Sequence, residues 1–390
     1  VCFGNKLCAF AAEKVNSKFI YYILQSQYFI QQFNNRKHGL IGGVSVNDLA
    51  EIGFPLSPLA EQQRIVDRIE SLFTKLDEAK EKAQTVVDSF ETRKAAILHK
   101  AFTGELTAKW REEHGVRMES WEKKSVGELC ISLKYGTAKK SDASGNVVVL
   151  RMGNLQQGEI DWSDLAYSND PDDIEKYKLF PGDVLFNRTN SAALVGKTAI
   201  YRGEHPAIYA GYLIKLDYDH DKIIGDYLNY ALNTLDAKKY CNSVKTDGVN
   251  QSNINAKKIG AYSFNVPSIP EQEKIVSVIQ KLLSKEQQAK EAAEAVLDQI
   301  DLMKKSILAR AFRGELGAND PNEERAVELL KKVLHTSAEP KSKTKRKFIP
   351  PKIEAQIKTD LERKIIMAFI QNDTTIMPIQ QLMSVCLREF

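Results

Sequence analysis

The chain has 390 residues, which allows two or three domains at about 100–200 residues each. Its hydrophobic fraction of 43% and charged fraction of 27% are typical of a globular protein with enough material for a core. With 55 Lys and Arg against 51 Asp and Glu, the formal net charge is only +4. This excludes a uniformly basic coat and restricts any nucleic-acid surface to a local patch.

The five cysteines are scattered, without a CxxC pair or a nearby histidine. We therefore expect no disulfide framework and no metal site, and a reducing, cytoplasmic setting. No apolar run approaches 18 residues, and no basic segment followed by an apolar run opens the chain, so we predict neither a membrane span nor a secretion signal. Because the chain begins with Val and stops in an apolar stretch, we expect it to be incomplete at both ends.

Residues 1–53 resemble only the last part of the region 118–266. Residues 19–24 (FIYYIL) echo residues 227–232 (YLNYAL), and residues 44–54 align with residues 254–264. We interpret 1–53 as the last part of a domain whose first copy lacks about 90 residues.

The segment 54–117 contains a long predicted helix that recurs in the segment 267–317. Residues 54–106 match residues 264–316 without a gap, at an offset of about 210 residues. A proline stands just before each helix, a glycine just after it, and neither residue type occurs within it, which is the expected pattern of helix start and stop signals. These signals are Pro58 and Gly104 in the first copy, and Pro270 and Gly314 in the second.

Apolar residues in both copies recur at alternating steps of four and three, interrupted only at Arg93 and Glu286. This is the a and d pattern of a coiled coil. We predict two helices of about 42 residues, each roughly 60 Å long, that pair with each other. Antiparallel pairing is a hypothesis, because a heptad pattern does not fix direction.

The region 118–266 reads as short strands broken by turns, followed by a helical stretch near 224–240. It predicts a compact α+β domain with strands at 147–152, 160–162, 183–187, 198–201 and 212–216. After residue 317 we expect a small helical appendage, with helices at 323–334 and 352–370 and a basic linker at 341–347. This linker is most simply a solvated charge run, and phosphate contact is the alternative.

No catalytic motif is convincing. GxGxxG, GxxxxGK[ST], HExxH and GxSxG are all absent from the sequence. Residues 169–172 (NDPD) faintly resemble the Asn/Asp-Pro-Pro-aromatic loop of adenine methyltransferases, but the second proline and the aromatic residue are missing, so we interpret them as a turn. We predict a protein with no catalytic residue, no metal and no cofactor.

Three polar clusters within 118–266, at 134–141, 151–157 and 187–191, are suited to DNA. Lysines and hydroxyls in a glycine-containing turn can contact phosphates. Arg can pair with guanine, and Asn with adenine, through two hydrogen bonds each. Each cluster alone is more often a solvated loop than a binding site, but three in one domain, without any enzyme signature, favour a binding module. The candidate DNA-binding residues are Lys134, Lys139, Lys140, Arg151, Asn154, Gln156, Asn187, Arg188, Thr189, Asn190, Ser191, Lys197 and Lys245.

Two repeated motifs carry a resemblance. A proline shortly followed by Glu-Gln-x-x-Ile-Val occurs at 58–66 and 270–276, and Ala-Phe-x-Gly-Glu-Leu occurs at 101–106 and 311–316. With the segment 179–197, they make residues 1–317 closely resemble the specificity subunit of type I restriction–modification systems.

The resemblance implies two target-recognition domains held apart by an antiparallel coiled coil, each reading half of a split double-stranded DNA site. The subunit itself would do no chemistry. Two modification subunits that methylate adenine with S-adenosylmethionine, and restriction subunits that use ATP, would dock on it. Half-length members can form homodimers, which is one way to supply a missing recognition domain.

The expected organisation is a last part of a first recognition domain (1–53), a first coiled-coil helix (54–117), a second recognition domain (118–266), a second coiled-coil helix (267–317) and a linker with a helical extension (318–390). The alternative is a coiled-coil scaffold that bridges proteins without reading DNA.

Overall fold

A computed structural model describes residues 14–39, 43–316, 320, 322 and 325–337. The chain divides into two compact units: unit 1 contains residues 1–85 and 293–390, and unit 2 contains residues 86–292. This division cuts both long helices, which we predicted as separate segments. Within the described residues, no helix is long and apolar enough to cross a membrane.

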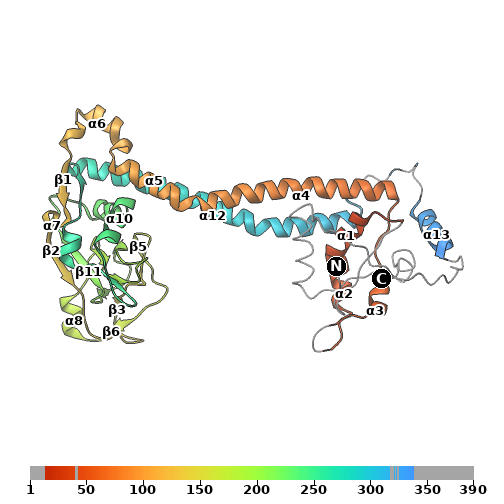
Figure 1. Cartoon of the computed structure of the whole chain (residues 1–390), viewed down its shortest axis with the longest axis horizontal. Coiled ribbons are helices and arrows are strands. Elements are labelled where there is room, and N and C mark those ends of the chain that lie inside the picture. Colours follow the sequence, from red (N-terminus) through yellow and green to blue (C-terminus); the bar gives the residue numbers. More distant parts are fainter. Residues whose placement is uncertain (1–13, 40–42, 317–319, 321, 323–324, 338–390) are drawn as a thin grey trace. The chain divides into compact units, whose positions relative to one another are not determined.

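The second long helix is continuous, as predicted: α12 spans Ile269–Ala311 (Figure 1). The first is two helices, α4 Leu59–Asp88 and α5 Phe90–Phe102, so our prediction of one uninterrupted helix was wrong. The interruption lies at Ser89, with φ −86° and ψ −2°. Neither glycine nor proline marks this position.

Arg93 accounts for the interruption. Its Nη2 donates a hydrogen bond to the carbonyl oxygen of Val86 at 3.0 Å, and its Nη1 donates to the hydroxyl of Ser89. A side chain that bonds to the preceding turn in this way competes with regular helical bonding. Its Nε lies 2.5 Å from Glu286 Oε2, so the two residues that interrupt the heptad pattern bond to each other.

The long helices pack antiparallel within each unit. In unit 2, Lys290 Nζ lies over the ring of Phe90 at 5.0 Å, and Arg93 bonds to Glu286. Residue numbers therefore increase along α5 in the direction in which they decrease along α12. In unit 1, Lys304 Nζ lies 2.6 Å from Asp77 Oδ1. Earlier residues of α4 share a hydrophobic cluster with later residues of α12: Ile65, Val66, Ile69, Leu308 and Ala311.

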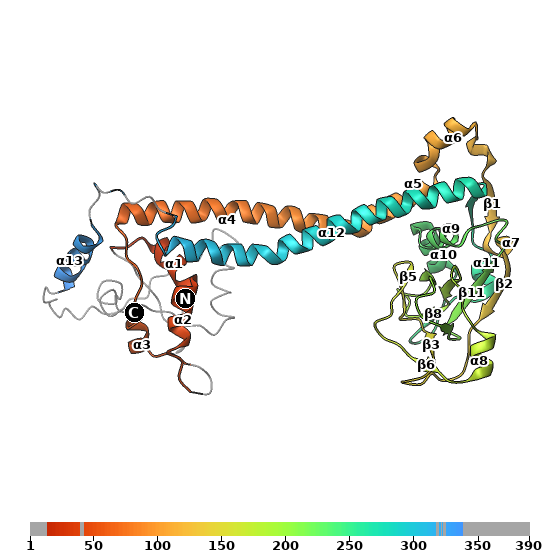
Figure 2. The same ribbon diagram turned by 180° about the vertical axis from the view of Figure 1, so that it is seen from behind.

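Unit 2 is an α+β domain, with α9 Gly225–Leu232 and α10 Leu235–Val244 lying between its long helices and its strands (Figure 2). A four-stranded antiparallel sheet has the order β2 Cys130–Tyr135, β11 Leu213–Tyr218, β7 Val184–Asn187 and β9 Thr198–Ile200. A second sheet has the order β10 Ala207–Tyr209, β3 Val147–Leu150 and β6 Tyr167–Ser168.

The remaining strands of unit 2 are short. They form the sheet β12 Thr246–Asp247, β13 Ser252–Asn253 and β8 Thr189–Asn190, and the pairs β4 Leu155–Gln156 with β5 Glu159–Ile160 and β1 Glu122–Ser125 with β14 Ser263–Val266. Its other helices are η1 Glu105–Thr107, α6 Ala108–His114, η2 Met118–Ser120, α7 Val126–Leu129, α8 Pro171–Lys176 and α11 Ala256–Gly260. All five predicted strands and the predicted helical stretch are present in unit 2, with boundaries shifted by a few residues.

Unit 1 repeats the helical part of unit 2. The helices α1 Ser17–Gln25, α2 Gln27–Asn34 and α3 Val46–Ala50 precede α4 as α9, α10 and α11 precede α12. Equivalent caps accompany them: the Ser26 hydroxyl accepts from the N–H of Phe29, and the Thr234 hydroxyl accepts from the N–H of Ala237. The predicted helix 323–334 is found as α13 Ala326–Ser337, whereas the linker 341–347 and the helix 352–370 lie outside the described residues.

A buried carboxylate joins three segments of unit 2. Glu271, in the first turn of α12, is fully buried. Its Oε1 accepts hydrogen bonds from Thr107 Oγ1 and Arg111 Nη1, both at 2.8 Å, and its Oε2 accepts from Trp121 Nε1 at 2.9 Å. The start of α12 is therefore tied to the residues that leave α5 and to the residue before β1.

Glu271→Gln is expected to destabilise the protein by about 3–5 kcal/mol, because it leaves the Arg111 guanidinium buried without its charge partner. The midpoint and slope of urea denaturation measure this effect. Glu273→Gln, an exposed position two residues further along α12, is the control and should stay within about 0.5 kcal/mol of wild type. Equal stability of both variants would contradict the role assigned to Glu271.

Candidate DNA interface

The candidate interface begins where β7 ends. The Arg188 guanidinium carbon lies 4.8 Å from the ring centre of Tyr135, the last residue of β2, and its Nη1 donates to the Gly211 carbonyl oxygen at 3.1 Å. Two predicted clusters, 134–141 and 187–191, are therefore neighbours. Within the first cluster, Gly136 has no room for a side chain, because a Cβ would lie 2.2 Å from the Tyr209 carbonyl oxygen.

A hairpin lies beside the second cluster. β13 pairs with β8 in the register Ser252 to Asn190, and β12 pairs with β13. The hairpin tip, residues 248–251, is exposed, and the side chain of Val249 is completely so. Sequence reasoning missed this element, although Asp247-Gly248 is a turn signal. We call Tyr135, Arg188, Asn190, Ser191 and the hairpin 246–253 the reader surface.

Two candidate lysines already have carboxylate partners. Lys134 Nζ lies 2.7 Å from Asp217 Oδ2, and this bond lowers the pKa of Asp217. Lys139 Nζ lies 2.6 Å from Asp170 Oδ2 and 3.4 Å from Asp173 Oδ1; the Asp170 hydrogen bond raises the pKa of Lys139. Lys140 is exposed and makes no ion pair within the described part of the chain, which leaves it the freest charge of this turn.

Three candidate residues are buried and hydrogen-bonded inside the domain. Asn154 accepts from the N–H of Arg151 and donates to two carbonyl oxygens. Asn187 is fully buried, and Thr189 Oγ1 accepts from Asn253 Nδ2 at 2.8 Å. Such side chains hold the loops in place and are not available to base edges without rearrangement.

The other candidates are partly exposed. Arg151 pairs with Asp164 at 3.0 Å. Lys245 donates to the carbonyl oxygen of Ala192 at 3.0 Å, which fixes the loop after Ser191 against the hairpin. Asn190 accepts from the N–H of Ser191 at 2.8 Å through Oδ1, so this bond engages only the acceptor end of its amide.

Lys197 belongs to a second feature, a cleft of about 390 Å³ lined by α5, α10 and the loop 193–197. We call it the lysine cleft, after Lys94, Lys197 and Lys238. Lys94 Nζ donates to the Gln157 carbonyl oxygen at 3.0 Å, and Lys197 Nζ donates to Gln156 Oε1 at 2.7 Å. Sequence reasoning found Lys197 and Gln156 but missed Lys94 and Lys238, which lie on helices.

The charges in the lysine cleft repel one another. Burial, and then the charge of Lys238, lower the pKa of Lys197. Burial also lowers the pKa of Lys94, against the effect of Glu91. One carboxylate among three ammonium groups leaves the cleft positive, a property that suits a phosphate.

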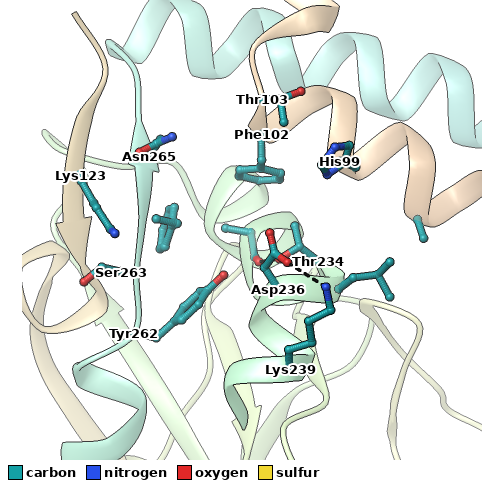
Figure 3. Close-up of a pocket in the computed structure, with 14 residues that line it drawn as sticks. His99, Phe102, Thr103, Lys123, Thr234, Asp236, Lys239, Tyr262, Ser263 and Asn265 are labelled. Carbon is teal, nitrogen blue, oxygen red and sulfur yellow. Dashed lines mark hydrogen bonds and ion pairs between the residues drawn. The ribbon is translucent and has the colours of Figure 1, made fainter. Parts of the chain in front are cut away.

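A larger cleft of about 510 Å³ lies where α5 meets α10 and β14 (Figure 3). Aromatic side chains of Phe102 and Tyr262 line it together with His99, and Asp236 pairs with Lys239 across 3.5 Å at its side. No hydrogen bond joins His99 to a nucleophile within the described residues. The cleft therefore shows none of the paired groups that acid–base or nucleophilic catalysis requires.

The described cysteines are unsuited to chemistry. Burial raises the pKa of Cys130 to about 12 and that of Cys241 to about 11, so both remain thiols at neutral pH. In the described ranges, no group of three or more His, Cys, Asp or Glu side chains is placed to hold a metal ion.

A family model matches two segments of the chain and shows the family to which it belongs. The family model for the type I restriction modification DNA specificity domain matches residues 1–86 and 118–295. The chain belongs to this family. The predicted resemblance to specificity subunits is thereby confirmed, and each of the two matched pieces includes the start of a long helix.

Curated relatives agree. The chain is 26% identical to the type I restriction enzyme StySPI specificity subunit of Salmonella potsdam over 326 residues, which is 81% of this chain and 69% of that protein. It is 27% identical to the EcoKI specificity subunit of Escherichia coli K12 over 300 residues, 73% of this chain and 63% of that protein. The chain thus spans about two thirds of the length of these relatives.

Solved structures support the fold. The HsdS subunit from Thermoanaerobacter tengcongensis matches with a TM-score of 0.54 at 21% identity, covering 77% of this chain and 70% of that one. A chain from a structure on complex assembly and conformational transition of the type I R-M system matches with a TM-score of 0.57 at 20% identity, covering 77% and 72%.

Proposed function

We propose that unit 2 contains a target-recognition domain that reads one half of a bipartite double-stranded DNA site through the reader surface. The observation that carries this proposal is the stacking of Arg188 on Tyr135 beside Asn190. Within the described residues, the Arg188 guanidinium makes one hydrogen bond, through Nη1, and its Nε is buried without a partner. The remaining Nη donors suit guanine. A planar cation held on an aromatic ring is also pre-organised for base recognition.

We propose further that the chain does no chemistry and positions other subunits. Adenine-methylating modification subunits would dock on it, and restriction subunits would join them. The two long helices would act as an antiparallel spacer between recognition domains, as the domain boundaries given by the sequence imply. The antiparallel packing found within each unit supports this role.

Residues 1–53 would belong to the first recognition domain, and a second copy of this chain could supply the other half-site reader. A homodimer would read a symmetric site, because its two readers are identical. A chain completed by a different first domain would read an asymmetric one.

Methylome sequencing tests the function. A host that carries this gene with modification and restriction genes is compared with a strain that lacks only this gene. Methyladenine is expected to vanish at one bipartite motif, and the symmetry of the motif separates the homodimer from the asymmetric reader. An unchanged methylome, together with purified chain that binds no duplex but associates with the other subunits, would favour the protein-bridging scaffold.

Arg188→Ala and Asn190→Ala are expected to reduce discrimination between the motif and unrelated DNA by about 1–3 kcal/mol each, because each removes the side chain that would contact a base edge. Competition binding with both duplexes measures the ratio of affinities. Glu273→Gln is the control. If both variants keep the wild-type ratio, the reader surface is assigned to the wrong residues.

Alanine at Lys94, Lys197 or Lys238 is expected to lower the slope of log affinity against log salt by about 0.9 for each phosphate that the variant no longer neutralises. Titrations between about 50 and 200 mM salt measure the slope on any duplex. Lys281→Ala, at an exposed position of α12, should leave the slope unchanged. Slopes equal to wild type for all three cleft variants would exclude the lysine cleft from the DNA path.

A further inference from the structure

The tip of the hairpin 246–253 carries an apolar side chain that the turn itself does not require. The N–H of Gly248 donates to the Gln251 carbonyl oxygen at 2.8 Å, so Val249 and Asn250 form a two-residue turn. Glycine, asparagine and aspartate are favoured at turn positions, whereas valine favours strands. The Val249 side chain is nevertheless completely exposed. Neither the turn nor the core of unit 2 therefore accounts for this valine.

Single exposed apolar residues are common on protein surfaces, so the position of Val249 is what matters. It belongs to the reader surface, because β13 pairs with β8 in the register Ser252 to Asn190. Three residues separate Ser252 from Val249, which places the tip about 10 Å further along the hairpin. The major groove of DNA is about 8.5 Å deep and admits a two-stranded ribbon, so a hairpin of this length can reach base edges.

The base of the hairpin is fixed on both strands. Asn253 Nδ2, on β13, donates to Thr189 Oγ1 on β8 at 2.8 Å. Lys258 Nζ, on α11, donates to Thr246 Oγ1 on β12 at 2.6 Å. These contacts hold the tip in place before DNA binds, which reduces the cost of ordering it in a complex.

The chemistry of the tip fits base edges better than phosphates. Residues 248–251 include no cationic side chain, and the neighbouring Asp247 carboxylate accepts a hydrogen bond from the Ser252 hydroxyl. Negative charge at this point disfavours contact with the phosphate backbone. The amides of Asn250 and Gln251 can pair with adenine, and the apolar group that the major groove presents is the thymine C5-methyl. The tip therefore carries groups suited to both members of an A·T pair.

We propose that Val249 is a specificity-determining residue whose methyl groups contact the C5-methyl of one thymine in the half-site read by unit 2. This inference rests on the proposed function, DNA reading by the reader surface. Contact between the two apolar groups removes both from water and so favours thymine at that position over bases that lack the methyl group. Val249 thus adds to the half-site a position that the hydrogen bonds of Arg188 and Asn190 do not read.

Deoxyuridine scanning tests this contact, because deoxyuridine pairs as thymidine does and lacks only the methyl group. The full chain, assembled with its modification subunits, is titrated with motif duplexes in which each thymine is replaced in turn, in competition with the unmodified duplex. One replacement is expected to weaken wild-type binding about 3- to 10-fold, the loss that corresponds to one buried methyl group. Val249→Ala should weaken binding to the unmodified duplex by a similar factor and should bind the two duplexes equally.

Val327→Ala, at an exposed valine of α13, is the matched control and should respond to the replacement as wild type does. Because the Val249 side chain is completely exposed, Val249→Ala should fold as wild type, and circular dichroism checks this.

The proposal is overturned if no replacement weakens wild-type binding. It is also overturned if Val249→Ala keeps the wild-type response, since the thymine methyl would then act through DNA shape or through another residue. The preference of the same samples for the motif over unrelated DNA tests the proposed function separately. A preserved preference without a thymine response would refute only the role of Val249.

Discussion

The buried carboxylate of Glu271 is the constraint on which unit 2 depends. A charge taken out of water is tolerable only where donors surround it, and here they come from three places in the chain: Thr107, Arg111 and Trp121. The first turn of α12 is therefore bonded to the residues that leave α5. The strand β1 starts at the next residue after Trp121, so the same contact fixes where the strands of unit 2 join its long helices.

Much of this fold could be predicted from the sequence because its signals are local. The heptad spacing and the flanking Pro and Gly residues located both long helices, and the apolar runs located five strands. Several strands were missed. β1 has four mostly polar residues and pairs with β14, far away in the chain, and β12 has only two residues. The strand β2, with six residues, was missed as well. The interruption at Ser89 was missed for a related reason: it arises from Arg93, whose side chain bonds to the preceding turn.

The candidate interface was predictable in composition but not in geometry. Polar residues at strand ends pointed to the correct region, and the sheet brought Tyr135 and Arg188 together. Whether a polar side chain faces solvent or holds a loop is decided by distant contacts, as for Asn154. Ion pairs also form between residues far apart in the chain: Lys134 pairs with Asp217, 83 residues away. Sequence analysis missed Lys94 because lysines are expected on the solvent-exposed face of a coiled-coil helix.

The ion pair between Arg93 and Glu286 gives the helix packing of unit 2 a preferred register. A slip of one heptad, about 10 Å along the axis, would still place a and d positions opposite a and d positions. The same slip separates a half-buried guanidinium from its half-buried carboxylate and leaves both without a partner. The loss of this ion pair thus disfavours shifted registers of the two helices, which a purely apolar seam would not distinguish as strongly.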